Sequence, residues 1–422
     1  MAAIQTGKQV DSTAYLYPWD VVGDPAAARR IARSGVSSVT LAAAYHSVRA
    51  ATPRHPGHRV VEARTAALYV PVRERAWAGQ RLTPGDGAAW AGHESFARAR
   101  DALAQAGLAS RAWLALTHAD GIAAGGTSSP VAPDLCTTNA FGDVYTYALC
   151  PSSEEVRLYA ATLTSECVTL AGVDSVTLEA GGPMGFGHMS AHEKTAGADN
   201  GPLDEALLSV CFCAACCSVY DQRGGADALR HSVREALSRA PGTSSTLDDG
   251  LRAALGDTTA DVLLETRQSA ARELRTTVLD AARSAGASRV SVHCSSEVWA
   301  TGPFGALLDD ARDLDGVIAA AWAQGPESVA EVSRLARSVH PSLTIGAYCT
   351  VLPPTPIDVQ QAARHWSALL EAGATELHLY HAGLASEARL DLLEAALDQL
   401  GATDSTRART APSPLSKEPS HD

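Results

Sequence analysis

The sequence predicts an α/β protein: a single (β/α)8 TIM barrel with a helical insertion after strand four. Three observations support this prediction. Short apolar runs alternate with helical patterns, there are eight such runs, and no GxGxxG or Walker-type loop follows any of them. The alternative is a doubly wound parallel sheet, which the missing phosphate-binding loops disfavour. A length of 422 residues fits one large barrel or several domains, so the internal pattern decides.

The first half of the chain contains four expected strands. They are AYLY at 14–17, SSVTLAAAYHS at 37–47, RAWLALTHAD at 111–120 and DSVTLEAG at 174–181. A helix should follow the first strand, with Asp24 as its N-cap, Pro25 at its first position and Gly35 at its end. Two further helices are expected, over 94–108 and over 154–170, where apolar residues recur every three or four positions.

The second half supplies four more strands and a closing helix. The strands are RVSVHCSS at 289–296, GVIAAAWAQ at 316–324, LTIGAYCTV at 343–351 and TELHLYHAG at 375–383, and the helix is 386–401. We therefore assign residues 1–400 to the barrel, with inserts near 47–95, 119–153 and 181–260. Residues 401–422 lack apolar periodicity and are expected to be disordered.

The composition of the chain argues against two classes of binding partner. A net charge of −13 without a cluster of Lys and Arg argues against nucleic acid and against an anionic membrane. Neither a signal peptide nor a long apolar segment is evident, so we expect a soluble, cytoplasmic protein. Its nine cysteines are then expected to be reduced. The oligomeric state is left open.

Polar and aromatic residues follow most of the expected strands, where a barrel places its chemistry. Glu179 ends a buried strand, where a carboxylate is costly unless it is solvated, paired or functional. Any single His or Trp there could instead be structural, but His residues after five strands favour a shared site. The candidate binding residues are Trp19, Asp20, His46, His118, His188, His192, His293, Trp299, Trp322, Tyr348 and His381.

Two segments suggest metals. The run LLSVCFCAACCSVY places Cys211, Cys213, Cys216 and Cys217 within seven residues, and CxC and CxxC spacings allow a structural zinc. The alternative is a set of buried thiols that pack as small hydrophobic groups. In GFGHMSAHEK, His188 and His192 would share a face if a helix begins there, and they would then bind a divalent ion.

The strand ending in Glu179, the rim of His and Trp, and the CFCxxC segment resemble glycoside-hydrolase-like TIM barrels. The resemblance is closer to a group of uncharacterised, alanine-rich actinobacterial proteins. It spans roughly residues 12–400, and its most specific pieces are NAFGDVYTYALCP, GFGHMSAHEK and LLSVCFCAAC. It implies a carbohydrate-active fold in which Glu179 is the acid/base carboxylate. Two features depart from the large retaining clan: Leu178 replaces the usual Asn, and strand seven ends in AYC without the nucleophile Glu.

The leading hypothesis is a hydrolase of a small-molecule or oligosaccharide substrate, without a required cofactor. Glu179 is its general acid, with a raised pKa, and Glu297 or Glu193 is the base or nucleophile. Asp20 and Asp120 are further candidates for the second carboxylate. His46, His118 and His293 would orient hydroxyls, and Trp299 and Trp322 would stack on the sugar. The rivals are a metal-dependent barrel enzyme that uses His188, His192, His293 or His381 with Glu179, and a sugar-binding barrel without activity.

Overall fold

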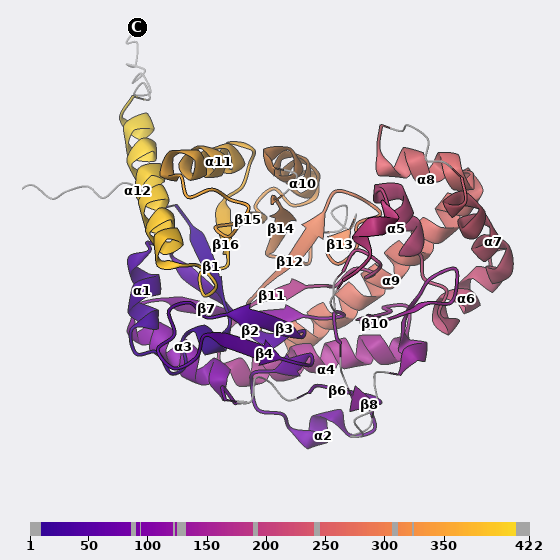
Figure 1. Ribbon diagram of the computed structural model, residues 1–422, viewed down its shortest axis with the longest axis horizontal. Helices are drawn as coiled ribbons and strands as arrows, with labels where there is room; N and C mark the ends of the chain where they lie inside the picture. The colour runs from indigo at the N-terminus through magenta and orange to yellow at the C-terminus, as the bar shows by residue number, and fades with distance from the viewer. Residues whose placement is uncertain are drawn as a thin grey trace, which may run out of the picture.

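Eight parallel strands close into a ring, which confirms the predicted TIM barrel (Figure 1). The computed structural model describes residues 10–85, 90–92, 94–120, 123–124, 132–188, 193–239, 245–305, 311–322 and 325–410. The ring closes because β1 pairs with both β2 and β16. The strands in order are β1 (Ser12–Leu16), β2 (Ser38–Tyr45), β7 (Ala109–Ala115), β11 (Ser175–Glu179), β12 (Arg289–Ser295), β14 (Gly316–Ala320), β15 (Thr344–Thr350) and β16 (Glu376–Tyr380).

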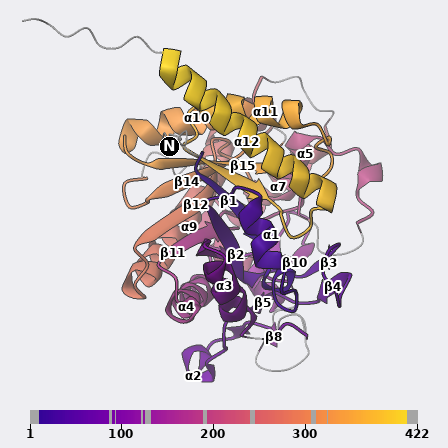
Figure 2. The same ribbon diagram turned by 90° about the vertical axis from the view of Figure 1, so that its left-hand side faces the viewer.

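Helices cover the outside of the ring, and Figure 2 shows α12 running along this outer layer. The covering helices are α1 (Ala27–Arg33), α3 (Ser95–Gln105), α4 (Glu154–Ala171), α9 (Asp257–Ser284), α10 (Gly325–Val339), α11 (Val359–Glu371) and α12 (Glu387–Thr410). The expected N-cap of α1 is wrong: the helix begins after Ala26, and the Asp24 carboxylate instead pairs with Arg30. Helix α12 continues to Thr410, ten residues into the expected tail.

The helical insertion after β11 forms a lobe beside the barrel, at the right of Figure 1. It contains α5 (Pro202–Leu208), α6 (Ala214–Asp221), α7 (Ala226–Leu237) and α8 (Leu247–Leu255). Its apolar side chains form a core of their own, separate from the main core. The long helix α9 packs on both α8 and the barrel helix α4, so it joins the lobe to the barrel.

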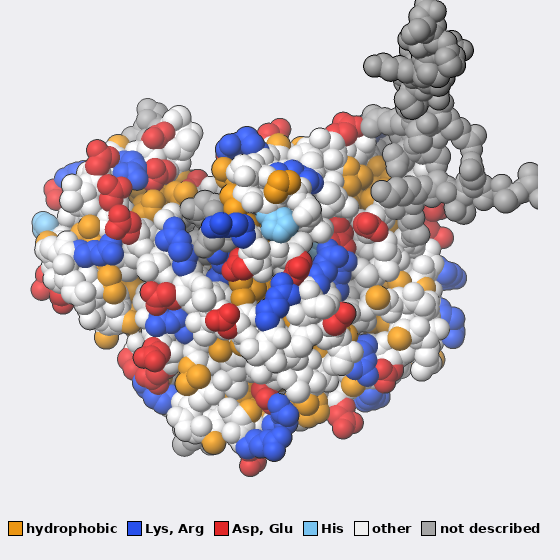
Figure 3. Space-filling view, turned by 180° about the vertical axis from the view of Figure 1, so that it is seen from behind, with side chains coloured by type: hydrophobic (Ala, Val, Ile, Leu, Met, Phe, Trp, Pro, Cys, Tyr) orange, Lys and Arg blue, Asp and Glu red, His pale blue; other side chains and the backbone are white. Residues whose placement is uncertain are grey.

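Short elements occupy the remaining connections. They are β3 (Val48–Ala51), β4 (Val60–Ala63), β5 (Ala67–Leu68), α2 (Glu74–Trp77), β6 (Leu82–Thr83), β8 (Ala123–Ala124), β9 (Cys136–Thr138), β10 (Val144–Leu149), β13 (Phe304–Gly305) and the 3-10 helices η1 (Pro18–Asp20), η2 (Pro133–Leu135) and η3 (Ala196–Ala198). On the face shown in Figure 3, acidic and basic side chains are intermixed. Among the described helices, none is long and apolar enough to cross a membrane.

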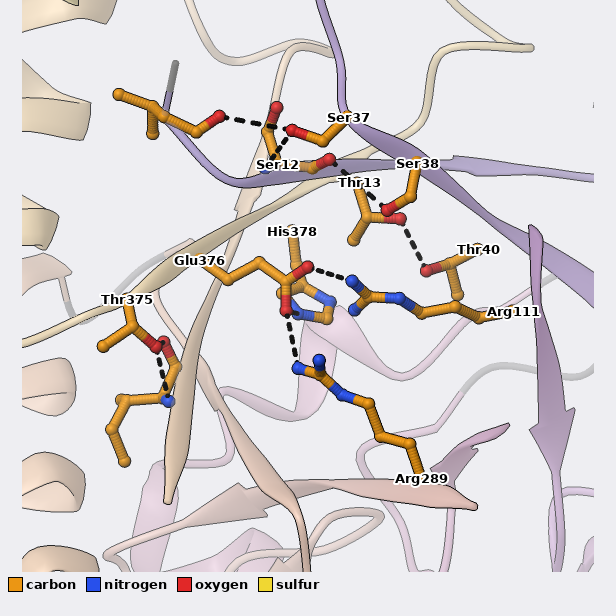
Figure 4. Close-up of polar contacts among 12 residues, drawn as sticks. Ser12, Thr13, Ser37, Ser38, Thr40, Arg111, Arg289, Thr375, Glu376 and His378 are labelled. Carbon is orange, nitrogen blue, oxygen red and sulfur yellow. Dashed lines mark hydrogen bonds and ion pairs between the residues drawn. The ribbon is translucent and has the colours of Figure 1, made fainter. Parts of the chain in front are cut away.

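The interior of the barrel is polar and aromatic, because alternate residues of each strand point inward. At the N-terminal end of the barrel, Glu376 forms ion pairs with Arg111 and Arg289, as Figure 4 shows. His378 Nε2 lies 3.4 Å from the same carboxylate. Above this layer, Tyr15 contacts rings from several other strands, including Trp113 of β7 at 4.9 Å between ring centroids. The ionic layer closes one end of the barrel and leaves the other end for a site.

Candidate functional site

A pocket of about 170 Å³ opens at the C-terminal end of the barrel. Strand ends and the loops that follow them supply its wall. Its described lining residues are His46, Ala115, His118, Glu179, Ala180, Met184, His188, His293, Cys294, Gly302, Pro303, Ile318, Ala320 and Tyr348. Six of these are residues that the sequence predicted for the site: Glu179, His46, His118, His188, His293 and Tyr348.

Glu179 is the single carboxylate among the described residues that line this pocket. It ends β11, and its Oε2 accepts a hydrogen bond from Trp113 Nε1. Burial raises the pKa of Glu179 to about 7, and the Trp113 hydrogen bond offsets only part of that rise. The direction of this shift agrees with the predicted rise, and it leaves a large fraction of Glu179 protonated at neutral pH.

Aromatic rings surround the Glu179 end of the pocket. Burial raises the pKa of Tyr348, and the charge of Glu179 raises it further, so this phenol stays protonated. Trp322 stacks on Tyr348 with ring centroids 5.3 Å apart. Because Trp322 is 49% exposed, part of its ring is open to solvent beside the pocket. Sugar stacking by Trp322 remains a prediction.

Three histidines form the opposite wall. The rings of His46 and His118 stack with centroids 3.9 Å apart, and His188 meets His118 edge-on at 5.9 Å. Burial lowers the pKa of His118 to about 2 and that of His188 to about 4. These rings are therefore neutral at pH 7. Gly302 makes room for His188, since a Cβ at its φ of +93° would lie 2.7 Å from His188 Nε2.

A chain of hydrogen bonds connects the pocket to the ionic layer. The Tyr15 hydroxyl lies 3.0 Å from His293 Nε2, on the pocket wall, and 3.0 Å from His378 Nδ1, below it. His378 in turn contacts Glu376. Burial lowers the pKa of His293 to about 3, so its ring is neutral. The Tyr15 bond therefore helps to fix the orientation of His293 in the pocket wall.

Two of the predicted tryptophans are structural. Trp19 is fully buried in the main core and stacks on Tyr17 with ring centroids 4.6 Å apart. Trp299 is buried in the core of the lobe, where its Nε1 donates to Asp248 Oδ1 at 2.8 Å. The predictions of Trp19 as a binding residue and of Trp299 as a sugar-stacking residue do not agree with these positions. Trp322 alone of the three has an exposed face.

Asp20 and His381 lie together behind the pocket wall, with Asp20 Oδ2 3.9 Å from His381 Nδ1. Burial raises the pKa of Asp20 to about 7 and lowers that of His381 to about 3, so the two are not an ion pair at neutral pH. Asp20 Oδ2 accepts the Tyr17 backbone N–H at 2.7 Å. The structure therefore gives both residues buried positions outside the pocket lining.

The predicted partners of Glu179 are also apart from the described pocket wall. Glu297 accepts the Trp299 backbone N–H at 3.1 Å and so closes its own turn. Glu193 is partly exposed on the loop after β11, where it accepts a hydrogen bond from Thr195 Oγ1 at 3.1 Å. His192 lies outside the described residues. The second carboxylate is therefore not identified by the pocket geometry.

The described part of the site brings together three side chains of metal-binding types, and they differ from the predicted ligands His188 and His192. The ligand atoms of His46, His118 and Asp120 lie within 4.8 Å of one another. However, the two imidazole planes are only 22° apart in a stack, so one ring must turn before both can face one ion. Asp120 Oδ1 also accepts the Ser47 N–H at 3.0 Å. The group would have to rearrange to bind a metal.

The cysteine segment is brought together as predicted, but with a different fourth member. Cys211, Cys213 and Cys216 are joined by Cys150, which lies 61 residues before Cys211 in the sequence. Cys217 faces elsewhere, and its Sγ donates to Phe212 O at 3.3 Å. The expectation that Cys217 completes the set is wrong, because it lies one helical step past Cys216 on α6.

Reasoning from strand ends missed the residues just below the rim. These are Trp113, Tyr15 and His378, which bind or orient Glu179 and His293. The sequence pattern that could have identified them is the alternation along a strand, in which every second residue points into the barrel, as in Glu376-x-His378-x-Tyr380. Applied to each strand, this period would have separated the barrel interior from its apolar outer face.

Solved structures with the same fold include glycoside hydrolases, whereas no family model and no curated protein matches the chain. The glycoside hydrolase domain of PgaB (BpsB) from Bordetella bronchiseptica aligns with a TM-score of 0.52 and 13% identity, over 92% of this chain and 99% of that one. The β-galactosidase from the psychrophilic Marinomonas ef1 aligns with a TM-score of 0.52 and 12% identity, over 94% of this chain and 60% of that one. At these identities the likeness shows a glycoside-hydrolase-like TIM-barrel fold.

Proposed function

We propose that this chain hydrolyses a glycosidic bond in the pocket at the C-terminal end of its barrel, with Glu179 as the general acid. The observation that carries the proposal is the pKa of about 7 at Glu179, a carboxyl group that lines the pocket. A general acid must be protonated at working pH, and an ordinary glutamic acid is not. The fold shared with two named glycoside hydrolases supports a carbohydrate as substrate.

The remaining pocket residues have roles that match a sugar. Neutral His46, His188 and His293 each offer a ring nitrogen as donor or acceptor for hydroxyl groups. Trp322, braced by Tyr348, presents an exposed aromatic face to the apolar C–H face of a ring. In this proposal the pocket and the adjacent Trp322 supply a proton donor, hydroxyl-binding groups and a stacking surface.

Hydrolysis also requires a base or nucleophile. Of the two leading candidates, Glu297 and Glu193, we favour Glu193, because Glu297 is held in its own turn. Glu193 follows the loop that carries His188, and its charge is one of the factors that raise the pKa of Tyr147. Tyr147 contacts His118 of the pocket edge-on, with ring centroids 6.0 Å apart. These contacts support Glu193 as the candidate base, with water or substrate between it and Glu179.

The proposal is tested with Glu179→Gln, using a panel of glycosides and the full chain. We expect kcat/KM to fall about 10²–10⁴-fold for alkyl glycosides, the range for loss of a general acid. The loss should be much smaller for a glycoside whose leaving group is an acidic phenol, since that group needs no proton. Wild-type activity should also fall above about pH 7, as Glu179 loses its proton.

The matched control is Glu155→Gln, because Glu155 is an exposed glutamate that pairs with Arg81 on the surface. It should retain wild-type turnover. If Glu179→Gln also turns over alkyl glycosides at the wild-type rate, Glu179 is not the acid. Oligosaccharide binding that weakens about tenfold in Trp322→Ala, without turnover of any glycoside by the wild type, would instead indicate a non-catalytic sugar-binding barrel.

A metal-dependent reaction is a second candidate, and the grouping of His46, His118 and Asp120 favours it. These ligands would suit a hydrolase or lyase in which the ion activates water or substrate. Activity that is lost on chelation, restored by Mn²⁺ or Zn²⁺ and absent from His46→Gln would support this candidate. Activity unchanged by chelation would eliminate it and leave the Glu179 mechanism.

A further inference from the structure

Four buried thiols converge where the helical lobe meets the barrel. Cys150 follows β10, Cys211 and Cys213 lie between α5 and α6, and Cys216 is in the first turn of α6. All four Sγ atoms lie within 4.8 Å of one another. The Cys150 and Cys216 sulfurs are 3.6 Å apart. Two separate stretches of chain therefore deliver a compact set of four sulfur ligands.

The spacing fits one tetrahedral ion. With a Zn–S distance of about 2.3 Å, the sulfurs of a tetrahedral site lie about 3.8 Å apart. A disulfide requires about 2.05 Å, well below the observed Cys150–Cys216 separation. An iron–sulfur cluster spreads its thiolates over several iron atoms, and this moves the sulfurs further apart than one shared ion does.

We propose that Cys150, Cys211, Cys213 and Cys216 bind a single zinc ion, and that this ion fastens the helical lobe to the barrel. Four thiolates leave no open position on a tetrahedral zinc, which is typical of a structural site. The cluster is also separate from the pocket that holds Glu179, whose lining includes none of these four cysteines. The ion therefore has a structural role.

The surroundings of the sulfurs match a buried anionic centre. The Cys213 backbone N–H donates to Cys211 Sγ at 3.4 Å, and the Ser152 hydroxyl lies 3.2 Å from Cys216 Sγ. Such contacts stabilise thiolates and orient metal ligands. A zinc ion with four thiolates carries two negative charges, which need a nearby cation when they are buried.

Arg267 supplies that cation. It is buried on α9 and lines a cavity of about 10 Å³ together with Cys150, Cys211 and Cys216. Its terminal nitrogens donate to the Ser209 and Trp299 carbonyls, while its Nε has no hydrogen-bond partner among the described residues. A buried guanidinium beside four neutral thiols would be uncompensated, whereas one beside a zinc thiolate centre is paired.

The test measures zinc by mass spectrometry in the full chain, purified under reducing conditions after growth with zinc. We expect about one zinc per chain in the wild type. Cys150→Ser should lose at least about tenfold in zinc content, because three thiolates bind more weakly. Cys217→Ser is the matched control, since Cys217 is in the same segment but outside the cluster, and it should retain the full zinc content.

Titration with a mercurial thiol reagent gives a second readout that does not depend on a variant folding. We expect one zinc to be released as four protected thiols react, followed by easier proteolysis within the lobe. A wild-type protein without zinc, or one containing iron, would overturn the proposal. Zinc lost from Cys217→Ser but kept by Cys150→Ser would show that the ligand set is wrong. Because none of these measurements uses turnover, they are independent of the glycosidase proposal.

Discussion

Two glutamates lie inside the barrel near its opposite ends, and their surroundings differ. Glu376, at the start of β16, is held by the guanidinium groups of Arg111 and Arg289. Burial alone would raise the pKa of Glu376, but His378 and Arg111 outweigh that effect and bring it well below its usual range. Glu179, at the end of β11, has the Trp113 N–H as its partner, and burial raises its pKa to about 7.

This difference shows how one barrel uses the same side chain for stability and for chemistry. A buried carboxylate beside two cations stays charged at neutral pH, and removing either partner of such a pair destabilises the fold. A buried carboxyl group without a neighbouring cation has a raised pKa, so it gains and loses its proton near neutral pH. The folded state is destabilised when that group ionises. Burial acts on the pKa of both glutamates, so the presence or absence of neighbouring cations distinguishes the structural end of the barrel from the reactive end.

The largest expected effect is at the compensated end. Glu376→Gln leaves Arg111 and Arg289 without a negative partner, and breaking a buried ion pair in this way costs about 3–5 kcal/mol. The free energy of unfolding, measured in urea at pH 7, should fall by that amount. Glu235→Gln is the control, because Glu235 pairs with Arg239 on the surface, where such pairs contribute about 0.5 kcal/mol. Equal losses in the two variants would contradict a stabilising role for the ionic layer.

The next effect has the opposite sign and depends on pH. The folded pKa of Glu179, about 7, lies above its ordinary value of 4.5, so the wild type loses stability as pH rises from 4.5 to 7. Each tenfold change in proton affinity corresponds to about 1.4 kcal/mol. Above pH 7, ionisation of Glu179 should therefore lower the free energy of unfolding of the wild type by on the order of 3 kcal/mol. Glu179→Gln should therefore be the more stable protein at pH 8 and nearly equal to wild type at pH 4.5.

Unfolding of both proteins across this pH range is the measurement. A constant difference at all pH values would mean that Glu179 does not titrate near neutrality, and this would weaken the comparison between the two ends. The Glu376 contribution has the reverse dependence, since a lowered folded pKa gives stability that is present above pH 4.5 and lost below it. The two glutamates thus act in different pH windows.

The fold was predictable because the barrel strands are short segments that are mostly buried, as in β2 and β12. Strand ends alone were also enough to identify Glu179, His46 and His293 as pocket residues. Element boundaries were less predictable: α12 continues past residue 400, where apolar periodicity stops.

What could not be predicted depends on which segments meet in space. Cys150 joins the cysteine cluster through contact between the lobe and the barrel, and no sequence spacing encodes that contact. Trp299 follows a strand end, as a stacking residue would, yet it is buried by the lobe. The strand-end rule places a residue at the rim, but neighbouring insertions decide whether it faces substrate or core.

The smallest effect concerns Tyr15, whose hydroxyl connects the two ends of the barrel. Tyr15→Phe leaves His293 Nε2 and His378 Nδ1 without this partner, which should cost about 1–3 kcal/mol of stability. Tyr69→Phe is the matched control, because the Tyr69 hydroxyl is buried without a hydrogen-bond partner among the described residues, so its removal should be neutral or stabilising. If both variants unfold at the same denaturant concentration, the Tyr15 bonds do not couple the ends. A loss confined to Tyr15→Phe would show that the hydrogen bonds of Tyr15 to His293 and His378 stabilise the barrel between the ionic layer and the pocket.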